Sequence, residues 1–382
     1  MAGIYERLGI RPIINARGTH TRLGGSLMAP EVLEAMREAA GAYIVLDELQ
    51  ERASALIARA TGAAAGMVTG GAAAGLLLGT AACIAGDDRA KIDRLPSTAS
   101  MKDEIVMHRA HRNGYDHSVR ATGARIVEVG YPHGTLPFQL AAALNDRTAA
   151  VFYLLAPWAS PGALPLAQTC AIAHEHGVPV LVDAAAVLPP AENLTRVIAA
   201  GADLVVFSGG KGINGPQSSG ILAGRADLIR AALLNGSPSH SIGRAAKAAK
   251  EDIVGLMVAL ERYLARDHAA ELAAWRGQAE WMMRDLHDLP GVTATYHHDE
   301  REHHTPRVEL TFDPATGIDA GEVIAALEGH DPRIFLFAPT GPSARPNSVV
   351  INTHTMQPGE ERIIGAALRE ALGERLQRGA GG

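Results

Sequence analysis

Lysine, cysteine and aromatic residues are scarce in this sequence of 382 residues. The formal net charge is −6 and no basic block occurs, so neither nucleic acid nor an anionic membrane surface is expected as a main partner. No apolar run approaches the roughly 20 residues that span a bilayer. Glu6 and Arg7 lie where a signal peptide would need an apolar core. We therefore expect a cytoplasmic protein without a membrane partner.

The sequence contains only two cysteines, Cys83 and Cys170, and this excludes a disulfide framework. Both lie in alanine-rich apolar runs, without a CxxC or CxxH neighbour. Buried thiols are therefore the simplest interpretation, and no redox or metal role is expected.

The length predicts two domains, because 382 residues exceed the size at which a single core stops growing. Hydrophobic residues make up 47% and charged residues 20%, as in an ordinary globular protein. We expect an N-terminal arm and helix over residues 1–50, a large domain over 51–250 and a smaller C-terminal domain over 251–382. The sequence pattern changes near Lys247 from alternating strands and helices to one long helix, which is expected to join the two domains.

Apolar strand-like runs alternate with helical patterns through the first two thirds of the chain. The expected strands are Glu104 to His108, Arg125 to Val129, Ala149 to Leu155, Val178 to Val182, Asp203 to Phe207 and Ser219 to Ala223. The expected helices include Met28 to Ala60, Gly71 to Ala85, Leu166 to His176 and Asn193 to Ala200. Continuously apolar strands are typical of a parallel sheet covered on both faces, which predicts an α/β fold. Two shorter strands, TPRVELTF and NSVVINT, and a helix from Glu360 are expected in the smaller α+β domain.

One of the few lysines lies in an unusual place. The sequence contains only Lys91, Lys102, Lys211, Lys247 and Lys250, so the other 30 of its 35 basic residues are arginines. Lys211 follows the buried run ADLVVF in the glycine-rich loop SGGKGINGP, where backbone and ligand can approach closely. A desolvated lysine amine can form a Schiff base, which arginine cannot do. Lys211 is therefore the predicted covalent anchor, in preference to a surface lysine.

Asp183 ends a second apolar strand, VPVLVD, 28 residues before the lysine. A carboxylate at the C-terminal end of a parallel strand faces the crevice where ligands bind in open α/β sheets. Pyridoxal 5′-phosphate (PLP) needs such an acid, because an anionic partner keeps its pyridine nitrogen protonated. The alternative is that Asp183 only caps the following helix.

The segment MVTGGAAAG places Gly70, Gly71 and Ala72 before an apolar helix. Unpaired N–H groups at a helix N-terminus bind phosphate, and small residues give the phosphate access. Ser208, three residues before Lys211, can add its hydroxyl group to the same phosphate. Close helix packing or a degraded dinucleotide-binding motif would explain the same pattern.

His111 lies in a polar loop after an expected strand, close to His108 and His117. The histidine spacing fits no strong metal-ligand pattern, so no metal is expected. We interpret His111 as an imidazole stacked on the PLP ring, with a solvated loop histidine as the alternative.

The order of these elements resembles that of PLP enzymes with the aspartate aminotransferase fold (fold type I). SGGKGINGPQSSGILAG looks like the lysine loop of the bacterial selenocysteine synthase (seryl-tRNA selenium transferase) family. PIINARGTHTRLGGSLMAPEVLEAM, LDELQERASALIARATGA and IGRAAKAAKEDIVGLMVAL are similar to shorter, tRNA-independent relatives such as the D-glucosaminate-6-phosphate ammonia-lyase branch. The resemblance covers roughly residues 8 to 365. It implies that Lys211 binds PLP covalently, that Asp183 pairs with the ring nitrogen, that His111 stacks, and that Gly70, Gly71 and Ser208 bind phosphate.

The resemblance also implies a reaction and an assembly. We expect a PLP-dependent lyase that removes the Cα proton of an anionic, hydroxylated amino acid and eliminates its β-hydroxyl group. An amino-acid racemase or a retro-aldol lyase is the alternative within PLP chemistry. A tRNA-dependent selenium transferase and a dinucleotide-binding dehydrogenase are less favoured, because the chain lacks a basic surface segment and a dehydrogenase leaves Lys211 unexplained. Active sites of this fold type are built from two subunits, so at least a homodimer is implied.

Arginines are the candidates for binding the anionic groups of a small-molecule substrate. Arg17 and Arg22 lie on the glycine-rich segment RGTHTRLGG together with His20, and Arg112 lies beside His111. Arg307 is the candidate for the α-carboxylate, because a guanidinium fork binds a carboxylate through two hydrogen bonds. Surface ion pairing is the alternative for each of them.

Overall fold

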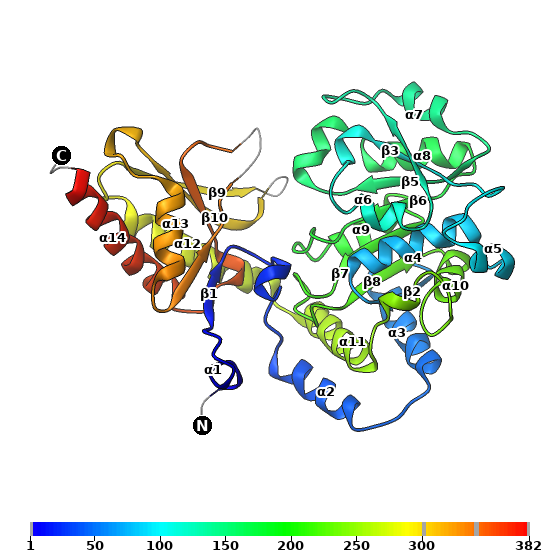
Figure 1. The fold of residues 1–382 in the computed structure, drawn as a ribbon, viewed down its shortest axis with the longest axis horizontal. Coiled ribbons are helices and arrows are strands. Elements are labelled where there is room, and N and C mark those ends of the chain that lie inside the picture. The colour runs from blue at the N-terminus through cyan, green and yellow to red at the C-terminus, as the bar shows by residue number, and fades with distance from the viewer. Residues whose placement is uncertain (1–2, 300–302, 340–343, 380–382) are drawn as a thin grey trace. The chain divides into compact units, whose positions relative to one another are not determined.

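The computed structural model describes residues 3–299, 303–339 and 344–379, which form two compact units (Figure 1). The large unit is Ser26–Arg266. The small unit consists of the chain up to Gly25 and from Asp267 onward. These limits differ from the expected boundaries at residues 50 and 250. The first segment joins the small unit because strand β1 (Ile13–Ala16) pairs in parallel with β11 (Arg333–Leu336), far along the chain.

A seven-stranded sheet forms the centre of the large unit. Its strand order is β2 (Ala65–Thr69), β8 (Gly220–Gly224), β7 (Leu204–Ser208), β6 (Val180–Asp183), β5 (Thr148–Leu154), β3 (Glu104–His108) and β4 (Arg125–Val129). Only β8 runs antiparallel to its neighbours in this sheet. The expected mostly parallel α/β sheet is confirmed. Strand β2 was missed because its end and the glycines that follow it, Gly70 and Gly71, were interpreted only as a phosphate loop.

Both faces of this sheet are covered by helices, as the apolar strands require. Side chains alternate along β6: Val180 and Val182 pack into one core, and Leu181 packs into the other. Helices on the first face are α3 (Leu46–Thr61), α8 (Leu166–Glu175), α9 (Asn193–Ala199) and α11 (Lys250–Ala265). Helices on the second face are α4 (Ala72–Ala85), α5 (Arg89–Arg94), α6 (Asp116–Arg120) and α10 (Ala226–Asn235). The carboxyl ends of β5, β6 and β7 therefore share one edge of a rigid layer.

Two helices that were expected to be continuous are each divided. The pattern from Met28 to Ala60 forms α2 (Pro30–Ala40) and α3, because Gly41 ends the first helix and the backbone at Val45 is extended. The long helix from Lys247 forms α11 and α12 (His268–Leu286). Asp267 caps α12, where its side chain accepts a hydrogen bond from the N–H of Ala270, so the chain starts a new helix.

The small unit has its own antiparallel sheet and its own core. The sheet order is β12 (Ser348–Asn352), β10 (His303–Phe312) and β9 (Val292–Asp299). Its covering helices are α12, α13 (Ala320–Gly329) and α14 (Glu360–Gly379). Leu310, Phe312, Met282 and Leu368 are fully buried in the core of this unit. This is the α+β arrangement expected for the C-terminal half, although β9 and β11 were not predicted.

Candidate cofactor site

The loop that carries Lys211 is held closely against its surroundings. A Cβ atom on Gly210 would lie 2.4 Å from Cα of Gln217, and one on Gly212 would lie 2.5 Å from the carbonyl oxygen of Leu188. The N–H of Gly215 donates a hydrogen bond of 2.8 Å to the carbonyl oxygen of Gly209. Glycine is therefore required here by close backbone packing, and this packing fixes where Lys211 leaves the loop.

Lys211 and Asp183 interact electrostatically in a desolvated environment. Burial lowers the pKa of the Lys211 amine, and the negative charge of Asp183 partly opposes this effect. Burial raises the pKa of the Asp183 carboxyl group. The hydrogen bond from the N–H of Ala185 and the charge of Lys211 lower this pKa, but by less. Asp183 Oδ1 accepts the N–H of Ala185 at 3.0 Å, which fixes its orientation at the end of β6. A lysine with a lowered pKa beside a buried carboxylate has the properties that a Schiff-base site requires.

The N-terminus of α4 lies beside the strands that lead to this pair. Gly71 has φ +95°, and no heavy atom lies within 4 Å of the position that a Cβ would take there, so the space beside it is open. Gly220 pairs with Thr69 on one side and with Ser208 on the other. A Cβ on Gly220 would lie 2.6 Å from the carbonyl carbon of Gly71, so glycine lets the strand contact the helix start. The helix N-terminus and Ser208 are thus on neighbouring elements, as phosphate binding requires.

His111 lies at the carboxyl end of β5, next to β6. Its Nδ1 accepts a hydrogen bond of 3.1 Å from the N–H of Leu154, and Leu154 is the register partner of Asp183. The ring is fully buried and contacts Tyr153 edge-on, with 4.5 Å between ring centroids. Burial, followed by the neighbouring His108, lowers the pKa of His111 to about 3. Stacking on a cofactor would require the side chains around this ring to move, and it stays a prediction.

His108, His111 and Tyr153 form one buried cluster, of which the sequence analysis named only the two histidines. Burial lowers the pKa of His108 to about 4 and raises that of Tyr153 to about 12. Tyr153 donates a hydrogen bond of 3.0 Å to the carbonyl oxygen of Leu164. Within the described part of the chain, no group of three or more His, Cys, Asp or Glu side chains is arranged to hold a metal ion.

Two of the four candidate substrate arginines lie near the same residue in the small unit. Arg307 on β10 is the register partner of Asn352 on β12. The Asn352 side-chain amide donates a hydrogen bond of 3.0 Å to the carbonyl oxygen of Arg17. Arg17 is half-buried and has no carboxylate partner among the described residues. Arg17 and Arg307 therefore both lie beside Asn352 and form one basic cluster of residues in the small unit.

The other two candidate arginines are placed differently. Arg22 lies on a short 3₁₀ helix, Thr21–Leu23, and is exposed. Arg112 of the large unit forms ion pairs with Asp116 and Glu128. Because two carboxylates neutralise it, Arg112 is a poor candidate for binding a substrate anion.

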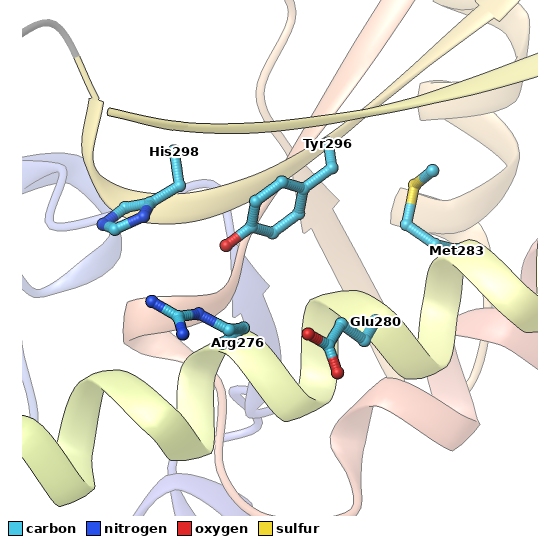
Figure 2. A pocket seen from close by; sticks show the side chains of 5 residues that line it. All are labelled: Arg276, Glu280, Met283, Tyr296 and His298. Carbon is cyan, nitrogen blue, oxygen red and sulfur yellow. The ribbon is translucent and has the colours of Figure 1, made fainter.

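Figure 2 shows a pocket of about 220 Å³ in the small unit. Its lining side chains are Arg276, Glu280 and Met283 from α12, and Tyr296 and His298 from β9. The Tyr296 hydroxyl group points between His298 and Arg276. None of the predicted site residues lines this pocket, so it is separate from the residues discussed above.

Sequence reasoning missed His354 and Asn352, which lie against the Arg17 segment. Asn352 lies within the expected strand NSVVINT and is the last residue of β12, and His354 directly follows the expected strand. Polar residues at the end of a strand were a usable signal, but only the pairing of β10 with β12 shows that they lie beside Arg307.

The fold and the lysine site together define a PLP-dependent enzyme of fold type I. Lys211 and Asp183 would hold the cofactor's carbonyl carbon and ring nitrogen, and the start of α4 would hold its phosphate. Comparison with known families then gives the narrower assignment. Residues 13–275 match the family model described as L-seryl-tRNA selenium transferase, and the chain belongs to this family.

Two curated relatives match most of the chain. A D-glucosaminate-6-phosphate ammonia lyase of Salmonella typhimurium is 33% identical over 96% of this chain and 97% of its own length. A 5′-C-glycyluridine monooxygenase-decarboxylase of a Streptomyces species is 34% identical over 87% of this chain and 83% of its own length. An L-seryl-tRNA(Sec) selenium transferase of Desulfovibrio desulfuricans is 30% identical over 71% of this chain but only 58% of its own length.

Solved structures agree with the family assignment. A structure of D-glucosaminate-6-phosphate ammonia-lyase has a TM-score of 0.85 at 33% identity and covers 98% of this chain and 99% of its own. The serine palmitoyltransferase of Sphingomonas wittichii has a TM-score of 0.60 at 13% identity, which shows the shared fold alone. These findings confirm the expected family, the fold type and PLP as the cofactor. No helix among the described residues combines the length and apolarity needed to cross a membrane.

Proposed function

We propose that this enzyme is a PLP-dependent lyase that deaminates an anionic, hydroxylated amino acid of the sugar-acid class. The observation that carries the proposal is the buried Lys211–Asp183 pair in a chain that matches an ammonia lyase over nearly its whole length. The basic cluster around Arg17 and Arg307 supports an anionic substrate. The name of the Salmonella relative supports a phosphorylated amino sugar acid as the first compound to test.

The residues of the site account for the proton movements of this reaction. When bound, PLP supplies an electron sink that stabilises negative charge at the substrate Cα. Asp183 keeps the ring nitrogen protonated. The glycine-rich loop fixes the position of the Lys211 amine near Asp183. The neutral Lys211 amine takes the Cα proton and can return it to the departing β-hydroxyl group, which leaves as water. Hydrolysis of the resulting enamine consumes one water and gives a 2-oxo acid and ammonia, so the atoms balance without an oxidant or a second keto acid.

The test is an assay of the PLP-loaded full chain against D- and L-amino acids, including 2-amino-2-deoxy sugar acids with and without a 6-phosphate. We expect ammonia and 2-oxo acid in a one-to-one ratio, without oxygen consumption. Lys211→Ala is the matched inactive control.

Other products would replace the proposal with a named alternative. Inversion with Cα deuterium exchange and no ammonia indicates a racemase, and release of an aldehyde indicates a retro-aldol lyase. Oxygen consumption with release of carbon dioxide indicates chemistry like that named for the Streptomyces relative. Transfer to seryl-tRNA would restore the selenium transferase hypothesis.

The expected homodimer, the cytoplasmic location and the absence of a nucleic-acid partner stay predictions. Sedimentation equilibrium of the full chain tests the first, cell fractionation the second, and a tRNA binding assay the third.

A further inference from the structure

A histidine that no role above uses lies in the basic cluster of the small unit. After β12 ends at Asn352, a 3₁₀ turn, Thr353–Thr355, brings His354 back against the segment that follows β1. The position of a Cβ on Gly18 lies 3.6 Å from His354 Cε1 and 3.8 Å from Asn352 Nδ2. Gly18 has φ +105°, a backbone conformation that favours glycine, and the two distances are those of ordinary van der Waals contact. His354 is therefore packed directly beside the backbone that carries Arg17.

Within the part of the chain that the structure describes, two nitrogen atoms of this cluster are buried and have no hydrogen-bond partner. They are Nδ1 of His354 and Nε of Arg17. Buried donors and acceptors in native proteins are nearly always paired, with protein, water or a ligand. The unpaired atoms therefore indicate that the cluster is completed by a bound group that accepts hydrogen bonds.

Among the described residues, the charged groups that act on His354 are both basic. Strand β10 contributes Arg307, and the segment after β1 contributes His20. Helix α12 contributes the uncharged ring of Trp275, edge-on at 6.2 Å between centroids. Burial first, and then the charges of Arg307 and His20, lower the pKa of His354 to about 4, so the imidazole is neutral at pH 7.

We infer that His354 belongs to the site that binds the anionic group of the substrate. It takes up a proton when a dianionic group binds beside Arg17 and Arg307. A dianion cancels the positive charge that disfavours imidazolium, and it accepts a hydrogen bond from the newly charged ring. The inference rests on the proposed anionic substrate and specifies a doubly charged group, such as a phosphate ester. Affinity for that group rises as the pH falls, because the bound state holds one more proton than the unbound state.

Sulfate is a suitable probe because it stays a dianion throughout the relevant pH range and does not react. Isothermal titration of the PLP-loaded enzyme with sulfate, in two buffers of different ionisation enthalpy, measures the protons taken up on binding. We expect net proton uptake at pH 5.5 and an affinity about tenfold higher at pH 5.5 than at pH 7.5, which requires the pKa of His354 to rise from about 4 in the free protein to about 6.5, the ordinary histidine value, in the complex. His354→Gln should bind sulfate with less than a twofold change between these pH values.

His20→Gln is the matched control, because it removes the other histidine of the cluster and should keep the proton uptake. The ¹⁵N shifts of His354 in the wild-type protein give a readout that needs no variant, and they should move from neutral to charged values on sulfate addition at pH 5.5. No saturable sulfate binding, binding without proton uptake, or loss of uptake only in His20→Gln would each overturn the inference. A negative lyase assay with intact proton-linked sulfate binding would remove the proposed reaction and leave the subsite in place.

Discussion

Lys211 is the residue on which the assignment depends most directly. Burial lowers the pKa of its amine, which favours the neutral nucleophile, and Asp183 limits the effect. Borohydride reduction of the yellow PLP-loaded enzyme should therefore leave a reduced cofactor adduct on Lys211. Peptide mass spectrometry identifies the modified lysine among the five in the chain.

Lys250 offers a matched control for this experiment. It is also partly buried, but its amine bonds the carbonyl oxygen of Ala39 and Glu251 instead of lying near Asp183. Lys250→Met should keep the adduct and Lys211→Met should lose it. An adduct on any lysine other than Lys211 would contradict the proposed site.

Asp183 supplies a charge at a fixed place, so its role can be separated from its shape. Asp183→Asn keeps the size of the side chain but removes the negative charge that faces the ring nitrogen. We expect PLP still to bind, while kcat falls by about two orders of magnitude or more, equivalent to ~2.7 kcal/mol of transition-state stabilisation. PLP absorbance and steady-state kinetics measure the two effects. Near-normal turnover would show that another residue holds the ring nitrogen protonated.

At the scale of elements, the proposed phosphate site depends on contact between strand β8 and the start of α4. Gly220→Ala adds a Cβ that would lie 2.6 to 2.9 Å from the Gly71 carbonyl group and the Ala72 nitrogen, so the helix start must shift. We expect the dissociation constant of PLP to rise about tenfold, since ~1.4 kcal/mol of phosphate binding is lost.

Gly134→Ala is the control for this substitution, because nothing lies within 4 Å of the added atom. Equilibrium dialysis of PLP against each variant gives the comparison. Equal PLP affinity in Gly220→Ala and wild type would place the phosphate away from the α4 terminus.

At the scale of the whole molecule, the buried histidines link stability to pH. The folded-state pKa is about 4 for His108 and about 3 for His111, whereas an unfolded histidine titrates near 6.5. Below pH 6.5 the unfolded chain binds protons that the folded chain does not, so the free energy of unfolding falls as the pH decreases. Above pH 7 both states are neutral at these sites, and the effect disappears. At pH 5 the free energy of unfolding is lower by about 2 kcal/mol for each histidine.

Urea unfolding of the wild type and of His108→Leu at pH 7 and pH 5 measures this linkage. The leucine variant should lose about 2 kcal/mol less between these pH values than the wild type. His176→Gln, which changes an exposed histidine, should behave like the wild type. An unchanged pH dependence in His108→Leu would mean that His108 titrates normally in the folded protein.

The strands, and the positions of Lys211 and Asp183 at strand ends, could be predicted because local sequence determines them. Runs such as VPVLVD and ADLVVF are apolar on both faces, and only a covered parallel strand uses such a pattern. Asp183 and Lys211 stand out because each is a polar residue beside an apolar strand. Asp183 ends one buried strand, and Lys211 follows another. The break between α11 and α12 was missed, because the helical periodicity continues across it and only the capping geometry of Asp267 shows the end.

The sequence by itself determined the fold class, and it singled out Lys211 and Asp183 as the proposed covalent lysine and its acidic partner, because these depend on short segments whose chemistry is local. Only the tertiary structure decided that the first 25 residues pack with the C-terminal half, since this depends on the pairing of β1 with β11, about 320 residues apart. The same long-range packing brings Arg17, Arg307 and His354 into one cluster and leaves Arg22 outside it. Periodicity and composition carry no information on contacts at such separations, because those contacts arise from burial of complete elements against each other.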